Sequence, residues 1–381
     1  MSKKLALLLG FLFLLPFIGY AQEIEEDFND FDDIFFEAQD IEEAVITESS
    51  TTTSVWNPFS VSGTVNANLG IVGNFVDGSF SPGGYLGFEG AINLTISPND
   101  SFSLCTGITE NLVNFPSISL NSFYFNYLFL RSIFISAGVR GVTWGYTRLF
   151  CDLDKSTNIM ADSGGYVICQ IQYPWSNGTL TFIPMLPIWA LKSGNIGTGY
   201  FEYALSAETV LFNTSFNLFT RMGGSKKDLS PLLGFETKKT ILGFDVYGQS
   251  YLKISDIYNA KSNYITSTFG LYRLWDAFDP NVGFNFEYQF TRRNRVDSTA
   301  VWEHLIAFEG GIKRLGVNKN HKIGLQWQHD IMKCSGFFEL AYLISGIFPY
   351  ADWSNACNFS YSKSGLQVIK FGTAISLDLS F

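Results

Sequence analysis

The last seventeen residues constrain the fold of this chain more than any other stretch, because apolar and polar side chains alternate along them. Residues 365–381 read GLQVIKFGTAISLDLSF. From Ile369 onward every odd position is apolar or Thr, and every even position is Lys, Gly, Ala, Ser or Asp. Successive side chains of a β-strand point to opposite faces. The pattern therefore predicts a strand with one apolar face and one small, polar or charged face.

The same alternation recurs along the chain between turn residues. Residues 59–71 and 86–96 show it first. The sixteen further candidate strands are 102–114, 117–129, 133–144, 166–173, 179–188, 199–212, 215–222, 232–238, 240–253, 264–275, 282–291, 303–314, 321–332, 337–347, 356–362 and 366–381. Segments 215–222, 232–238 and 356–362 are short, so the patterns predict 14 to 18 strands, with 16 or 18 favoured.

The connections between the candidate strands alternate in length. The short ones are PND, Arg131-Ser132, PWSN, FNTS, Lys238-Lys239 and DPN, and the long ones are 145–165, 189–198, 223–231, 254–263 and 292–302. Short turns at one end and long loops at the other are typical of a transmembrane antiparallel up-and-down β-barrel. We therefore predict an all-β chain of this class, with its short turns in the periplasm. A large soluble β-sandwich with an aromatic core is the alternative.

The chain divides into three predicted parts. Residues 1–21 have Lys3 and Lys4 ahead of an apolar run that ends in small residues, which is typical of a cleaved signal peptide. Residues 22–55 are acidic, because twelve of the 35 acidic residues and no Lys or Arg lie between 23 and 48. We expect a solvated periplasmic tail or a short amphipathic helix there. Residues 56–381 are the predicted barrel.

Composition agrees with a wall that faces lipid. The chain has 37 Phe, 18 Tyr and 8 Trp, with only 16% charged residues. A barrel with an apolar outer band and an aromatic girdle at each membrane interface has such a composition. Basic residues are not clustered, which argues against a nucleic-acid partner.

Two stretches resemble known families. The alternating final strand with Phe381 at its end resembles the end of Gram-negative and spirochaetal outer-membrane β-barrel proteins. The resemblance implies an outer-membrane location, contact with outer-membrane lipid, and recognition of Phe381 by the barrel-assembly machinery. The stretch ISAGVRGVTWGYTRLFCDLDK resembles a strand, Trp-Gly and long loop of porin-like barrels, which implies that 145–165 folds as a constriction or surface loop. An outer-girdle role for Trp144 is the alternative.

Side chains opposite in parity to the apolar face should line the barrel interior. The charged residues predicted there are Glu89, Arg140, Glu202, Glu208, Arg221, Asp245, Glu287, Glu309, Lys313, Asp330, Glu339, Lys370 and Asp378. Charged side chains on the lipid side would cost about 2–4 kcal/mol near the membrane midplane, which explains the sorting. Nine acids against four bases predict a mild preference for cations. The alternative is that these charges pair across a filled barrel that conducts nothing.

Catalytic, metal and cofactor sites are not predicted. The chain has three histidines, His304, His321 and His329. His329 is followed by Asp330, but neighbouring strand residues point to opposite faces and cannot act together. His321 is expected in a turn and His304 at a membrane interface. Five cysteines have no metal-binding spacing, and three of them, Cys151, Cys334 and Cys357, are expected in or near loops, where a disulfide is conceivable.

The function predicted from these features is a porin-like outer-membrane channel for passive passage of small polar solutes. Self-association of the barrel is compatible with the sequence. Two alternatives remain open: a surface interaction or adhesion protein on a plugged barrel, and a transporter of hydrophobic compounds gated by the amino-terminal segment.

Overall fold

A computed structural model describes residues 59–76, 79–111, 117–140, 142, 144–150, 166–193, 198–223, 231–254, 263–275, 280–294 and 300–380. The predicted signal peptide, the acidic segment, Cys151 and Phe381 lie outside these residues, so the roles expected for them stay predictions.

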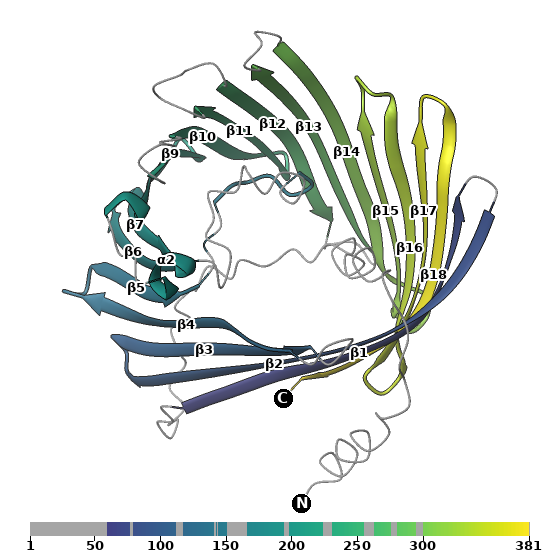
Figure 1. Ribbon diagram of the computed structural model, residues 1–381, viewed down its shortest axis with the longest axis horizontal. Coiled ribbons are helices and arrows are strands. Elements are labelled where there is room, and N and C mark those ends of the chain that lie inside the picture. The colour runs from purple at the N-terminus through teal and green to yellow at the C-terminus, as the bar shows by residue number, and fades with distance from the viewer. Residues whose placement is uncertain are drawn as a thin grey trace, which may run out of the picture.

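Eighteen antiparallel strands form one closed sheet (Figure 1). The strands are β1 (Phe59–Val76), β2 (Ser79–Asn99), β3 (Phe102–Asn111), β4 (Ser117–Phe129), β5 (Ile133–Val139), β6 (Tyr166–Trp175), β7 (Gly178–Pro187), β8 (Glu202–Leu211), β9 (Thr214–Gly223), β10 (Leu232–Ile241), β11 (Phe244–Ile254), β12 (Asn263–Trp275), β13 (Asn281–Asn294), β14 (Ala300–Leu315), β15 (His321–Asp330), β16 (Ser335–Phe348), β17 (Ala351–Ser362) and β18 (Gly365–Ser380). Each strand pairs with its neighbours in sequence, and β1 pairs with β18. The predicted fold class is confirmed, at the upper end of the predicted strand number.

Apolar side chains cover the outside of the sheet. In β18, Phe371, Ile375 and Leu379 are exposed, as the alternation in this segment predicts. Large exposed Phe, Leu and Trp side chains occur on most of the other strands as well. Soluble proteins rarely expose so much contiguous apolar surface, whereas lipid solvates it and the closed sheet leaves no strand edge unpaired. The barrel is therefore of the transmembrane class.

The three weakest strand predictions correspond to full strands. β9 and β10 each have ten residues, and β17 has twelve. β17 begins at Ala351, so Cys357 lies within the strand and not near a loop, because the pairing with β16 extends to Ala351. The turn predicted at Lys238-Lys239 is at Leu242-Gly243 instead. Both residues there have positive φ, of 54° and 78°, as a tight two-residue hairpin requires.

Two further boundaries differ from the sequence prediction. β5 ends at Val139 and not at residue 144, because the chain leaves the sheet directly after Val139, next to Gly138 with its φ of +141°. His321 is the first residue of β15 and does not lie in a turn, since it pairs with Leu315 of β14 and Ile344 of β16.

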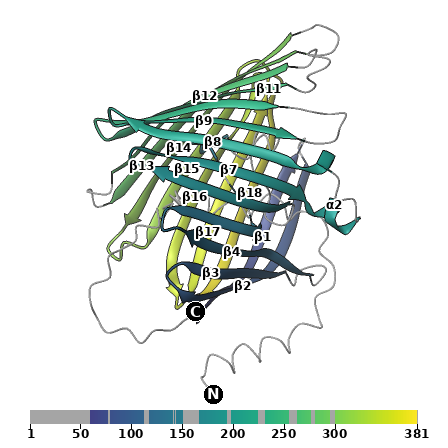
Figure 2. The same ribbon diagram turned by 90° about the vertical axis from the view of Figure 1, so that its left-hand side faces the viewer.

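Long connections leave the barrel at one end. They follow β5, β7, β9, β11 and β13, whereas the turns after β6, β8 and β10 are short. The connection after β7 carries the helix α2 (Ile188–Lys192) and the 3-10 helix η5 (Thr198–Tyr200). Figure 2 shows the tilted strands from the side, with α2 at one end of the barrel. Across the described ranges, the helices are too short or too polar to cross a membrane.

Candidate functional site: a segment packed inside the barrel

The chain after β5 turns into the ring of strands and runs along its inner wall (Figure 1). The described part comprises residues 142 and 144–150, which we call the inner segment. At its start, the Arg140 guanidinium donates to the Ser136 hydroxyl at 2.8 Å and lies 4.9 Å from the centre of the Tyr124 ring. These contacts fix the point at which the chain leaves the wall.

Apolar packing holds the first half of the inner segment. Val142 and Trp144 pack against a cluster of buried side chains from β6–β11, and the Trp144 ring lies 6.4 Å from that of Phe219. The other buried members are Ile168, Ile183, Met185, Ala204, Leu232 and Tyr251. Trp144 therefore lies inside the barrel and does not belong to an outer girdle. Burial of these surfaces stabilises the inner segment on the wall.

Gly145 lets the backbone approach the wall closely. Its φ is +131°, and a Cβ at this position would lie 3.1 Å from Oε1 of Gln249 and 3.6 Å from Oε1 of Glu236. Gln249 and Glu236 are directly opposed on β11 and β10. Glycine is favoured here because it tolerates positive φ and has no side chain to fill the contact.

Tyr146 connects the inner segment to β8 and β9. Its hydroxyl donates to Oε1 of Glu208 at 3.2 Å and lies 2.9 Å from the Ser215 hydroxyl, which also bonds to Glu208 at 2.9 Å. The ring packs against Tyr247 and Tyr272. Burial, together with the nearby carboxylates, raises the pKa of Tyr146 to about 12, although the Ser215 bond opposes the shift. The hydroxyl therefore stays protonated and remains a hydrogen-bond donor at physiological pH.

Glu287 of β13 anchors the far end of the inner segment. The backbone N–H of Arg148 donates to its Oε1 at 2.5 Å, and those of Leu149 and Phe150 donate to its Oε2 at 3.0 and 3.1 Å. The Glu287 side chain is fully buried. Three consecutive N–H groups around one carboxylate form a compact anion site. Such charge-assisted bonds are stronger than those between neutral groups.

Side chains of the same turn complete the contact. The Arg148 guanidinium lies 3.8 Å from the centre of the Tyr272 ring on β12, and Phe150 is almost completely buried. Cation–aromatic contacts of this kind are favourable when the pair is shielded from water. The inner segment is thus fixed by apolar contacts, hydrogen bonds and a cation–aromatic contact to strands β6–β13.

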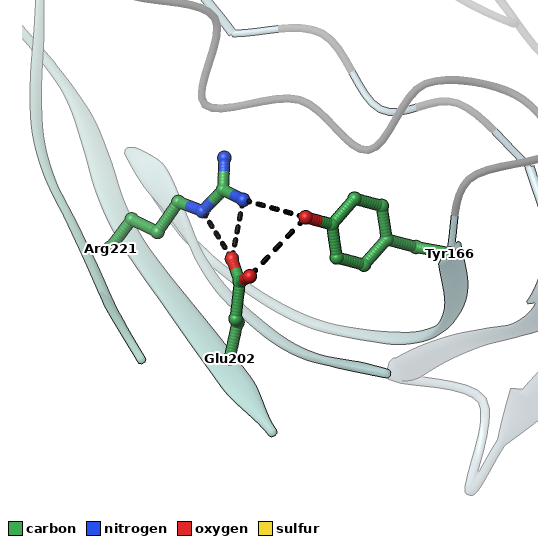
Figure 3. Close-up of polar contacts among 3 residues, drawn as sticks. All are labelled: Tyr166, Glu202 and Arg221. Carbon is green, nitrogen blue, oxygen red and sulfur yellow. Dashed lines mark hydrogen bonds and ion pairs between the residues drawn. The ribbon is translucent and has the colours of Figure 1, made fainter. Parts of the chain in front are cut away.

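A second polar cluster lies near the end of the barrel from which the long connections leave. The Arg221 side chain of β9 forms an ion pair with Glu202 of β8, with Nε of Arg221 2.8 Å from Oε2 of Glu202. The Tyr166 hydroxyl of β6 donates to Oε1 of Glu202 at 3.2 Å and lies 3.4 Å from Nη2 of Arg221 (Figure 3). Since Tyr166 reaches across β7, the cluster ties three strands together.

The remaining residues predicted to line the interior have polar neighbours on adjacent strands. Asp245 forms an ion pair with Lys238 at 3.0 Å, and Glu339 accepts from Nδ2 of Asn358 at 2.9 Å. Asp330 accepts from the backbone of Met332 and Lys333, which closes the turn after β15. The others are opposed to amides: Glu89 and Asp378 to Asn66, Glu309 to Asn285, Lys313 to Asn281, and Lys370 to Asn358 and Asn74.

Several residues of the site escaped the sequence prediction. Glu236 is almost fully buried and accepts a 3.0 Å bond from Asn217, but it lies in 232–238, a short candidate strand for which no inward face was assigned. The exposed Leu233 and Phe235 on alternate positions could have revealed its inward parity. Tyr247 was missed because only charged side chains were named as interior residues. The sequence gives no signal for the backbone bonds to Glu287.

The histidines and cysteines do not form a reactive centre in the described ranges. Each histidine lies beside a tyrosine: His304 beside Tyr288, His321 beside Tyr342 and His329 beside Tyr361. Cys105, Cys169, Cys334 and Cys357 are free thiols. The part of the chain that is described contains no cluster of three or more Asp, Glu, His or Cys suited to a metal ion.

Known proteins with solved structures share the architecture of this chain. Neither a family model nor a curated protein matches the chain. Among solved structures, OccD3 (OpdP) of Pseudomonas aeruginosa has a TM-score of 0.54 and 8% identity, covering 87% of this chain and 93% of its own. OccK2 (OpdF) of the same organism, solved in complex with glucuronate, has a TM-score of 0.52 and 9% identity, covering 84% of this chain and 98% of its own. At this level of identity the likeness concerns architecture alone.

Proposed function

We propose that this protein is an outer-membrane channel for passive passage of small polar solutes, and that the inner segment narrows its passage. The observation that carries the proposal is the attachment of residues 148–150 to Glu287 inside a closed barrel of eighteen strands. About sixteen to eighteen strands leave room for an aqueous channel, whereas about eight leave space only for side chains. We propose that the inner segment, held on the wall by β8, β9 and β13, reduces that space.

The wall opposite the contacts of the inner segment carries the groups that solutes would meet. Hydrogen bonds from the inner segment go to β8, β9 and β13, and its ring contacts go to β9, β11 and β12. Elsewhere in the barrel, Glu339, Asn358 and Lys370 share one register row across β16–β18. Rows of acids, amides and a single base suit polar solutes that exchange hydrogen bonds during passage.

A mild cation preference forms part of the proposal. Among the charges predicted to line the interior, Arg221 is paired with Glu202, and Asp245 is paired with Lys238. Asp330 is paired with Lys333, and the acids predicted to line the interior still outnumber the bases there, which favours cations over anions. The protein would have no catalytic role. Export, insertion by the barrel-assembly machinery through Phe381, and association between barrels belong to the same proposal.

The direct test is electrical. Full-length mature protein, reconstituted into planar lipid bilayers, should give stepwise conductance and a reversal potential of the sign expected for modest cation preference. A folded barrel that gives no steps would contradict the channel and favour the surface-interaction alternative. Conductance that appears only after residues 22–55 are deleted would favour gating by the amino-terminal segment.

A further inference from the structure

The outer surface carries a polar and aromatic cluster at the end of the barrel from which the long connections leave. It consists of Arg292 of β13, Trp302 and His304 of β14, His329 of β15 and Tyr361 of β17, and we call it the rim cluster. Each member lies within five residues of that end of its strand. The register places them on the outer face, since Trp302 and Arg292 are opposed and both are exposed.

Arg292 is the cation of the rim cluster. Its guanidinium lies 5.1 Å from the centre of the Trp302 ring, which in turn lies 5.3 Å from the Phe290 ring. The next residue, Arg293, points to the opposite face and forms an ion pair with Glu303 at 3.5 Å. Within the described ranges Arg292 has no such acidic partner. A guanidinium stacked on an aromatic ring keeps its planar set of donors available to an anion.

The two histidines can supply donors beside Arg292. Nδ1 of His329 lies 2.9 Å from the Tyr361 hydroxyl, which accepts a 3.0 Å bond from Nε1 of Trp327. Because Tyr361 already accepts from Trp327, its own hydrogen can be donated to Nδ1 of His329. The neutral His329 ring then carries its proton on Nε2, which becomes a donor. His304 has the equivalent contact, 2.6 Å from Nδ1 to the Tyr288 hydroxyl.

Arg292, His304 and His329 lie at consecutive diagonal positions on β13, β14 and β15. Arg292 is opposed to Trp302, two positions from His304, and His329 is opposed to Ile306, also two positions from His304. Diagonal neighbours of this kind are separated by about 7–8 Å in an antiparallel sheet. One guanidinium and two imidazoles therefore form a continuous diagonal line on the surface.

We infer that the rim cluster binds the phosphate group of an anionic lipid in the adjoining leaflet. Arginine forms bidentate bonds with phosphate, and aromatic side chains with a polar end occur at the level of lipid headgroups. Among the described residues Arg292 has no acidic partner, and most side chains on its face are apolar, so it is complementary in charge to such a lipid. The inference rests on the membrane location in the proposed function but not on conduction.

The test compares lipids that differ in charge. The full-length protein in detergent micelles is titrated with phosphatidic acid or with phosphatidylcholine, and thermal unfolding reports binding. We expect phosphatidic acid to raise the unfolding temperature more than phosphatidylcholine does. Loss of the guanidinium in R292Q should weaken phosphatidic acid binding about tenfold, the factor expected for one charge-assisted hydrogen bond. H304Q gives a second variant in case R292Q does not fold.

Arg273 provides a matched control. It lies on the same outer face near the other end of the barrel, with its guanidinium 4.6 and 4.7 Å from the Phe244 and Trp275 rings. R273Q should bind phosphatidic acid as the wild type does. Equal weakening in R273Q and R292Q, or no preference for phosphatidic acid, would overturn the inference. An equal shift with inorganic phosphate would show an anion site that does not select lipid, and would overturn it too. Channel measurements on the same preparations test the proposed function separately.

Discussion

The Tyr247 hydroxyl and the Arg148 backbone N–H donate to the same oxygen, Oε1 of Glu287, at 2.6 and 2.5 Å. A residue of the barrel wall and a residue of the inner segment thus share one buried carboxylate. Tyr247 orients the Glu287 carboxylate, and the negative carboxylate holds the backbone of the inner segment. A substitution at Glu287 should therefore first alter the position of the inner segment inside the barrel.

Substitution of Glu287 should release the inner segment. E287Q removes the negative charge and gives the side chain donors where it has to accept three backbone N–H groups. Each lost or weakened bond to a charged group costs about 1.5–3 kcal/mol. We expect larger and noisier single-channel conductance. E339Q, which changes a carboxylate bonded to Asn358, is the control and should leave the noise unchanged. Quiet, wild-type conductance in E287Q would contradict the anchoring role.

Substitution of Gly145 tests the close approach of the inner segment to the wall. G145A adds a Cβ 3.1 Å from Oε1 of Gln249 at a backbone φ of +131°. Strain of about 1–3 kcal/mol is expected for a residue forced into such a conformation. Conductance fluctuations should increase, although the barrel itself should unfold as the wild type does. G90A is the matched control, since a Cβ at Gly90 would meet nothing within 4 Å. Equal behaviour of the two variants would rule out tight docking at Gly145.

The Glu202 and Arg221 pair should show energetic coupling. Both side chains are largely shielded from solvent, at 15% and 21% exposure, so loss of one partner leaves a poorly solvated charge. We expect E202Q and R221Q each to lower the unfolding temperature. The double variant should lose less than the two single variants combined, with a coupling free energy of about 0.5–3 kcal/mol. Strict additivity in thermal unfolding measurements would show that the ion pair contributes nothing.

The strand pattern was predictable because the alternation of each strand can be read from its own short segment of sequence. Alternation in residues such as Phe371 and Lys370 depends only on which side faces lipid, so all eighteen candidate strands correspond to real ones. The weak candidates were real because pairing with two neighbours stabilises strands whose own pattern is short. Strand ends were less predictable. Leu242 at positive φ and the early end of β5 depend on turns whose residue types have several possible conformations.

The position of the inner segment could not be predicted from the sequence. The Trp-Gly pair at 144–145 raised the possibility of a constriction loop, but the same residues suit an outer girdle. What decides between them is the surface on which Trp144 packs, and Phe219 lies 75 positions away in sequence. Backbone donors at 148–150 are common to nearly every residue type. A carboxylate such as Glu287 can therefore be predicted to point inward, whereas its partners cannot be identified.

Pairing of β1 with β18 has a consequence for biogenesis. The register joins Val65 to Leu379 and Phe75 to Ile369, so the seam unites the two most distant parts of the barrel sequence. Until β18 has been synthesised and delivered, β1 has no partner on that side, and its exposed edge is prone to pair with another chain. Cyclisation of the sheet therefore requires both ends of the barrel sequence, from β1 to β18, to be present. An intermediate that lacks β18 keeps the β1 edge open to aggregation.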